Sequence, residues 1–158
     1  TLEKKDQMVP FGTSNLEMVD VGCGSGILSI AGIKLGVKRA LGVDVDPDAI
    51  TAARENAVLN SVSNHVELEV GSVMDVRTGQ YAIRRATLVV ANILAPVLVH
   101  LQGECLGDLL APRGKLILSG ILTEQEAEVV TAVHGSGLLL EDRLQRDDWL
   151  ELVVSKME

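Results

Sequence analysis

The stretch that decides the fold reads Met18-Val19-Asp20-Val21-Gly22-Cys23-Gly24-Ser25-Gly26. It begins as a β-prone run and stops at a cluster of glycines, after which residues 27–35 place apolar side chains at helical spacing. Glycines at a strand–helix junction allow a tight turn and let a ligand lie against the main chain. The stretch therefore predicts the ligand-binding loop of a Rossmann-like fold.

The rest of the chain continues this alternation of strands and helices. Strands are predicted at residues 40–43, 66–70, 87–91, 115–119, 138–143 and 149–155, and helices at 47–60, 96–110 and 124–134, with a turn at 112–114. Alternation of this kind is typical of a parallel sheet with helices on both faces. The last two strands are joined by a short charged turn and must pair antiparallel. We expect a doubly wound, mostly parallel, seven-stranded α/β sheet with a C-terminal antiparallel hairpin.

Length and composition are consistent with one domain. The chain has 158 residues, of which 47% are hydrophobic and only 2% aromatic. The core must therefore consist of Val, Leu, Ile and Ala, the usual material of buried parallel strands. Residues 16–158 are expected to form this domain, and the polar segment 1–15 is interpreted as a loop or the remnant of something longer.

Charge and cysteine content limit the classes of partner. The net charge of −8 disfavours independent nucleic-acid binding and favours a basic protein partner. Three aromatic residues offer no platform for stacking bases. Two cysteines and three scattered histidines give neither a disulfide framework nor zinc-ligand spacing, so no metal is expected. With no signal peptide and no apolar run of membrane-spanning length, we expect a cytoplasmic protein.

An acidic side chain beside the glycine loop favours one cofactor over another. Asp20 lies two residues before Gly22, where the anionic pyrophosphate of a dinucleotide would meet a carboxylate. S-adenosyl-L-methionine instead carries a cationic amino group and a sulfonium, which a carboxylate can balance. The loop, with Asp20, Gly22, Gly24 and Gly26, is therefore predicted to bind S-adenosyl-L-methionine. The alternative for Asp20 is that it only ties down the loop backbone.

Three further polar side chains follow predicted strands, at the edge of the sheet where ligands bind in such folds. Asp44 ends the second strand and is predicted to accept hydrogen bonds from ribose hydroxyls, with a solvated loop acid as the alternative. Asp46 is better explained as a helix cap. Ser72 follows the third strand, where the chain can frame an adenine edge. Asn92 directly follows a buried strand and is either a ligand contact or a turn residue.

Four motifs together resemble one known family. They are DVGCGSGILSI at 20–30, GVDVDPD at 42–48, NILA at 92–95 and LSGIL at 118–122. In this order they resemble the methyltransferase domain of the PrmA family, which methylates the large-subunit ribosomal protein L11. The resemblance covers residues 16–155 and implies cofactor contacts by Gly22, Asp44 and Asn92.

The resemblance also implies a reaction and a substrate. The expected activity is methyl transfer from S-adenosyl-L-methionine to protein amines, either lysine side chains or an N-terminal α-amine, of a basic ribosomal protein. We predict Asn92 as the catalytic residue, orienting the amine through its side-chain carbonyl. No histidine or carboxylate is predicted to serve as a dedicated base.

The chain departs from the family pattern before the glycine loop. Family members carry an N-terminal recognition domain and a loop of the form Phe-Gly-Thr-Gly-x-His-x-Thr-Thr. Here Phe11-Gly12-Thr13 runs directly into Ser14-Asn15-Leu16, so a threonine that contacts the cofactor has no counterpart. Two other readings therefore stay open: a small-molecule methyltransferase of the same fold, and an inactive cofactor-binding module. An NAD oxidoreductase is disfavoured by Asp20.

Overall fold

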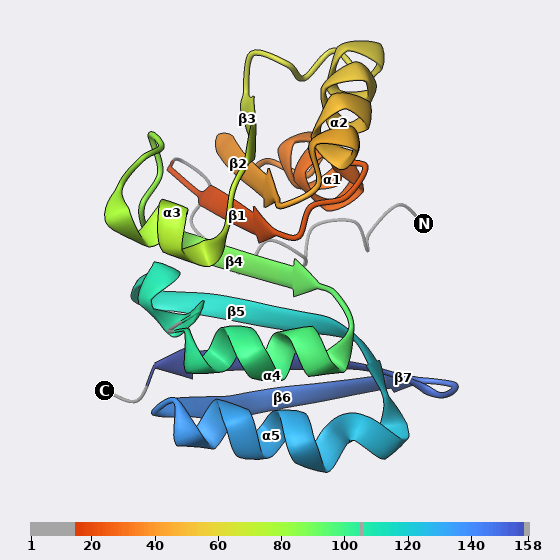
Figure 1. Ribbon diagram of the computed structural model, residues 1–158, viewed down its shortest axis with the longest axis vertical. Helices are drawn as coiled ribbons and strands as arrows, with labels where there is room; N and C mark the ends of the chain where they lie inside the picture. The colour runs from red at the N-terminus through yellow and green to blue at the C-terminus, as the bar shows by residue number, and fades with distance from the viewer. Residues whose placement is uncertain (1–14, 105, 157–158) are drawn as a thin grey trace, which may run out of the picture.

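The computed structural model describes residues 15–104 and 106–156 (Figure 1). Residues 1–14, which include the Phe11-Gly12-Thr13 loop, lie outside the described part of the chain, so the expectations for this segment stay predictions. The elements are β1 (Glu17–Val21), α1 (Ile27–Lys34), β2 (Arg39–Asp44), α2 (Pro47–Leu59), β3 (Val66–Val70), α3 (Val73–Thr78), β4 (Ala86–Asn92), α4 (Ala95–Gly103), β5 (Leu110–Leu122), α5 (Glu126–Gly135), β6 (Leu138–Arg146) and β7 (Trp149–Lys156), with 3₁₀ turns at Leu106–Leu109 and Thr123–Gln125.

The seven strands form a single sheet in the order β3-β2-β1-β4-β5-β7-β6. The first five strands of this order run parallel, and β7 pairs antiparallel with both β5 and β6. Val19 in β1 lies between Leu41 of β2 and Val89 of β4. The strand order reverses between β1 and β4, and ligands bind at such a switch point in open α/β sheets. The predicted fold class is confirmed.

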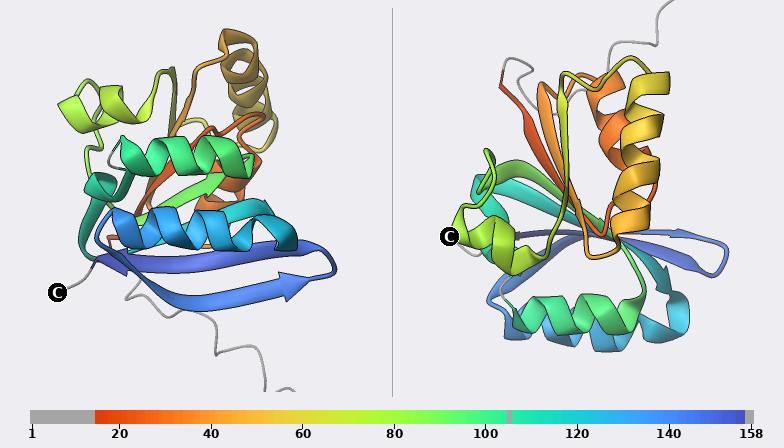
Figure 2. Two further views of the ribbon diagram at one scale, coloured as in Figure 1. Left: turned by 60° about the horizontal axis from the view of Figure 1, so that its bottom comes forward. Right: turned by 45° about the horizontal axis from the view of Figure 1, so that its top comes forward.

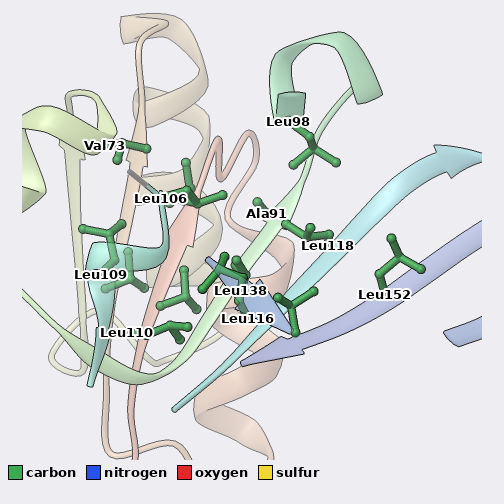
Figure 3. Packing of buried hydrophobic residues seen from close by; sticks show 14 of the residues in the cluster. Val73, Ala91, Leu98, Leu106, Leu109, Leu110, Leu116, Leu118, Leu138 and Leu152 are labelled. Atoms are coloured by element: carbon green, nitrogen blue, oxygen red, sulfur yellow. The ribbon is translucent and has the colours of Figure 1, made fainter. Parts of the chain in front are cut away.

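Helices cover both faces of the sheet (Figure 2). Helices α1 and α2 lie on one face, and α3, α4 and α5 on the other. Under the second group, the largest core cluster combines aliphatic side chains of the helices with those of the central strands. Figure 3 shows Leu98 of α4 packed near Ala91 and Leu118. The described core is aliphatic, as the composition predicts, and Tyr81 only packs against its margin.

Two expectations for the segment after β4 were wrong. The helix predicted at 96–110 ends at Gly103, and Leu110 already begins β5. Residues 106–109 form a separate 3₁₀ turn that buries Leu106 and Leu109 in the core instead of continuing the helix. The turn predicted at 112–114 lies inside β5. Arg113 adopts a left-handed conformation there, with a φ of 61°, and the chain continues as a strand.

A short helix was also missed. Val73–Thr78 forms α3, whose six residues give too little periodicity to stand out in the sequence.

No helix within the described ranges is long and apolar enough to cross a membrane.

Candidate cofactor and acceptor site

The glycine loop connects β1 to α1 at the carboxyl edge of the sheet. Gly22, Gly24 and Gly26 all have positive φ angles, of 68°, 52° and 79°. The amides of Gly22 and Cys23 donate to the carbonyl of Val43 at 2.8 and 3.0 Å, which ties the loop to the end of β2. The left-handed backbone explains why the sequence needs glycine at these positions.

The three glycines differ in what surrounds them. A Cβ on Gly22 would lie 2.5 Å from Cγ2 of Ile93, and one on Gly26 would lie 3.1 Å from Cβ of Ala53. A Cβ on Gly24 would meet no described atom within 4 Å. A side chain at Gly22 would therefore displace Ile93 and one at Gly26 would press against Ala53, whereas Gly24 presents open space. Gly24 is the part of the loop against which a ligand can lie.

Asp20 lies beneath this loop and is almost fully buried, with 1% of its surface exposed. Its Oδ2 accepts hydrogen bonds from the backbone amide of Ser29 at 3.1 Å and from the Ser29 hydroxyl at 2.7 Å. Burial raises the pKa of Asp20 to about 6, against the lowering effect of these two bonds. The carboxylate thus anchors the first turn of α1, and a contact with a cofactor stays a prediction.

Asp44 lies at the end of β2 beside the loop. Its Oδ2 accepts from the Gly24 amide at 2.9 Å, and its Oδ1 accepts from the Asp46 amide at 3.0 Å. The fold therefore brings together two predicted site residues that are twenty positions apart. Asp46 caps α2 by accepting from the Asp48 amide at 2.9 Å, which confirms its predicted role.

Ser72 is the N-cap of α3. Its hydroxyl and its amide both donate to Oδ2 of Asp75, at 2.9 and 2.8 Å, and these bonds hold the pKa of Asp75 below its ordinary value. The described contacts of the Ser72 side chain serve this cap. Its position after β3 keeps it at the carboxyl edge, and a role toward adenine stays a prediction.

Asn92 is the last residue of β4 and is exposed at the carboxyl edge. It pairs with Ser119 of β5, and the neighbouring Gly120 has a φ of 78°. A Cβ on Gly120 would lie 2.9 Å from the carbonyl oxygen of Ile93 and 3.0 Å from Oδ1 of Asn92. Gly120 therefore lets β5 pass close to the Asn92 side chain. Gly120 belongs to the LSGIL motif at 118–122, but the sequence alone assigns it no role.

A depression of about 560 Å³ lies beside Asn92. Asn92, Ser119 and Gly120 form one wall, and residues 144–146 and 149–151 of the β6–β7 hairpin form another. Figure 1 shows the turn of this hairpin projecting on the side where β4 ends. Trp149 stands at its rim with 56% of its surface exposed. The sequence did not predict that the hairpin would contribute to the site.

The charge of the loop region favours a cationic ligand. The stretches 20–30 and 42–48 contain four aspartates and no lysine or arginine. A pyrophosphate placed here would meet carboxylates without a neutralising side chain, whereas a sulfonium and an ammonium would be attracted. The observed arrangement therefore fits S-adenosyl-L-methionine better than a dinucleotide.

The family model described as ribosomal protein L11 methyltransferase (PrmA) matches residues 2–157. The chain belongs to the PrmA family. A ribosomal protein L11 methyltransferase of Geobacter metallireducens is 42% identical over 139 residues, covering 88% of this chain and 43% of that protein. One from Geotalea uraniireducens is 46% identical over 132 residues, covering 84% and 40%. This PrmA-family chain thus spans about two-fifths of the length of these relatives.

Solved structures agree with the family assignment. The ribosomal protein L11 methylase of Lactobacillus delbrueckii subsp. bulgaricus superposes with a TM-score of 0.80 at 33% identity, covering 92% of this PrmA-family chain and 72% of that one. An RNA methyltransferase of Salinibacter ruber, solved with S-adenosyl-L-homocysteine, gives a TM-score of 0.67 at 21% identity, covering 90% and 82%. At 21% identity, the similarity to the Salinibacter ruber enzyme shows only that the two proteins share a fold.

Proposed function

We propose that this chain is the catalytic unit of an S-adenosyl-L-methionine-dependent methyltransferase that acts on amines of a basic ribosomal protein. One observation carries the proposal. In a PrmA-family chain, the left-handed glycine loop, Asp44 and Asn92 lie at the carboxyl ends of the neighbouring strands β1, β2 and β4. No basic side chain occurs in the two stretches that surround the loop.

The cofactor supplies a methyl group already activated by a sulfonium. In our proposal the backbone at Gly24 lies against it, because an added Cβ there would meet open space. Each oxygen of Asp44 accepts one backbone amide. A carboxylate offers about four acceptor positions, so capacity remains for two ribose hydroxyls. Asp44 would then hold the loop and the ribose at the same time.

Asn92 is proposed to orient the acceptor amine. Its Oδ1 is a neutral acceptor, which suits an amine that must lose its proton before it attacks. Neutralising a lysine near pH 7 costs about 4 to 5 kcal/mol, and an α-amine costs about 1 kcal/mol, from their reference pKa values. Holding the neutral amine in line with the methyl–sulfur bond is then the main contribution of this residue.

The acceptor is proposed to be a ribosomal protein because the similar proteins are named for that substrate. The acidic net charge of −8 supports an encounter with a basic partner. The depression beside Asn92 gives a side chain a route to the edge of β4. With such a substrate, the proposed compartment is the cytoplasm.

Transfer of radiolabelled methyl groups onto purified ribosomal protein L11 tests the proposal. With the cofactor saturating, Asn92→Ala should lower kcat roughly 10- to 100-fold, as expected for losing one hydrogen bond to the reacting amine. Asn64→Ala, on an exposed turn before β3, is the matched control. Unchanged turnover in Asn92→Ala would refute the assigned role, and turnover only with small amines would refute the protein substrate.

A further inference from the structure

A concentration of basic side chains lies at the end of the molecule opposite the proposed active site. A hollow of about 560 Å³ is lined by Arg77, Arg84, Arg85 and Asp108. A second hollow, of about 730 Å³, also includes Arg85, so the two lie next to each other at this residue. We call this surface the basic end and define it by Arg77, Arg84, Arg85, Arg113, Lys115 and Lys156.

The topology explains why this surface faces away from the glycine loop. Arg85 directly precedes β4, and Arg113 lies near the start of β5. Both positions belong to the amino-terminal ends of parallel strands, on the left of Figure 1, where β7 also ends. Ligands of this fold bind at the other edge. The basic end is therefore no part of the cofactor or acceptor site.

Few carboxylates neutralise the basic end. Arg77 pairs with Asp108 at 3.1 Å, and Lys115 pairs with Glu141. Across the described ranges, no carboxylate lies within ion-pair distance of Arg84, Arg85 or Arg113. The Arg84 guanidinium donates instead to the carbonyl of Arg77 at 3.3 Å. Six of the fourteen lysines and arginines thus gather here, on a chain whose net charge is −8.

We propose that the basic end binds the phosphodiester backbone of RNA. Arginine predominates, and its planar fork matches the oxygens of a phosphate. The arginines that line the two hollows are exposed, so each arginine would bind a single free anion only weakly. A polymer with a charge on every nucleotide gains from several such contacts at once, because each releases a condensed counterion. A sparsely charged acidic protein lacks that gain.

The expected recognition is independent of base sequence. No aromatic side chain lines either hollow, so stacking on bases is not available there. The choice of RNA over DNA rests on the proposed function, because a ribosomal protein substrate would be met beside RNA. The net charge of −8, from which independent nucleic-acid binding is not expected, averages over the whole chain and does not describe this local cluster.

Fluorescence anisotropy with a labelled, unstructured 20-nucleotide RNA tests the proposal. The variant is Arg85→Gln with Arg113→Gln, which removes two exposed charges without breaking a described ion pair. Arg143→Gln with Arg146→Gln on the β6–β7 hairpin is the control, with the same change in net charge. Circular dichroism verifies that both variants fold.

With single strands, each phosphate contact adds about 0.7 to the slope of log affinity against log salt concentration. Losing two contacts should therefore lower the affinity of the Arg85→Gln, Arg113→Gln variant about 25-fold at 0.1 M salt. The slope of log affinity against log salt should shrink by about 1.4, and the control should keep most of both. The proposal is overturned if the unmodified chain does not bind RNA at low salt, or if both double variants lose affinity equally. Competition by polyglutamate as effective as that by RNA would also overturn it in favour of an acidic protein partner.

Discussion

Replacing Asp20 with Asn is expected to remove a pH dependence from the stability of this chain. Asp20 is buried beneath the glycine loop, and its pKa rises from an ordinary value of 3.8 to about 6 in the fold. The folded state therefore binds this proton more tightly than the unfolded state between about pH 4 and pH 6. Stability from this group is fully present below pH 4 and is lost as the pH rises through 6.

The size of the effect follows from the two pKa values. A pKa difference of this size corresponds to about 3 kcal/mol over the full range, at about 1.4 kcal/mol per pKa unit. About 2 kcal/mol of it falls between pH 4.5 and 7.5. Asn can keep an oxygen at the Oδ2 position facing Ser29, but it has no charge to bury. Its other effects on stability should not change with pH.

Urea unfolding of both proteins across pH 4.5 to 7.5 measures this difference. The free energy of unfolding of the unmodified chain, relative to Asp20→Asn, should fall by about 2 kcal/mol toward pH 7.5. Ser29→Ala removes a hydrogen bond that lowers the pKa of Asp20, so its transition should move to higher pH. Parallel curves for the unmodified chain and Asp20→Asn would show that burial does not raise this pKa.

Three other substitutions test separate parts of the structure. Gly24→Ala meets no neighbouring atom, so it should cost only about 1 to 2 kcal/mol of left-handed strain in urea unfolding, yet weaken cofactor binding at least about 10-fold in calorimetry. Gly120→Ala should cost about 2 kcal/mol or more, because its Cβ would press on Ile93 and Asn92. The buried side-chain amide of Gln102 has no hydrogen-bond partner in the described part of the chain. Gln102→Met should therefore raise the free energy of unfolding by about 1 to 2 kcal/mol, and a decrease would reveal a partner.

Much of the fold followed from local patterns. The glycine loop, the alternation of strands and helices and the short turn before Trp149 were enough to predict seven strands with a terminal hairpin. The missed elements depend on short-range details. Helix α3 has only six residues, although Ser72 and Asp75 carry the spacing of a capping box. Arg113 takes a left-handed conformation that lets β5 continue through a sequence typical of turns.

The site was predictable only where it lies near the strand ends. Spacing placed Asp44 at the edge where it contacts Gly24. The bond from Ser29 to Asp20 depends on how α1 packs on β1, and the approach of Gly120 to Asn92 depends on the pairing of β4 with β5. The charge of the basic end arises from α3, the loop before β4 and the start of β5, which meet only in three dimensions.

Calorimetric titration of this chain with S-adenosyl-L-methionine tests the central claim most directly. We expect micromolar binding that is lost in Asp44→Ala, because the residue holds the loop and is proposed to hold the ribose. Asp46→Ala, which removes the neighbouring cap of α2, is the matched control and should bind normally. Absence of binding by the folded chain, or equal binding by Asp44→Ala, would contradict the assignment of this edge as the cofactor site.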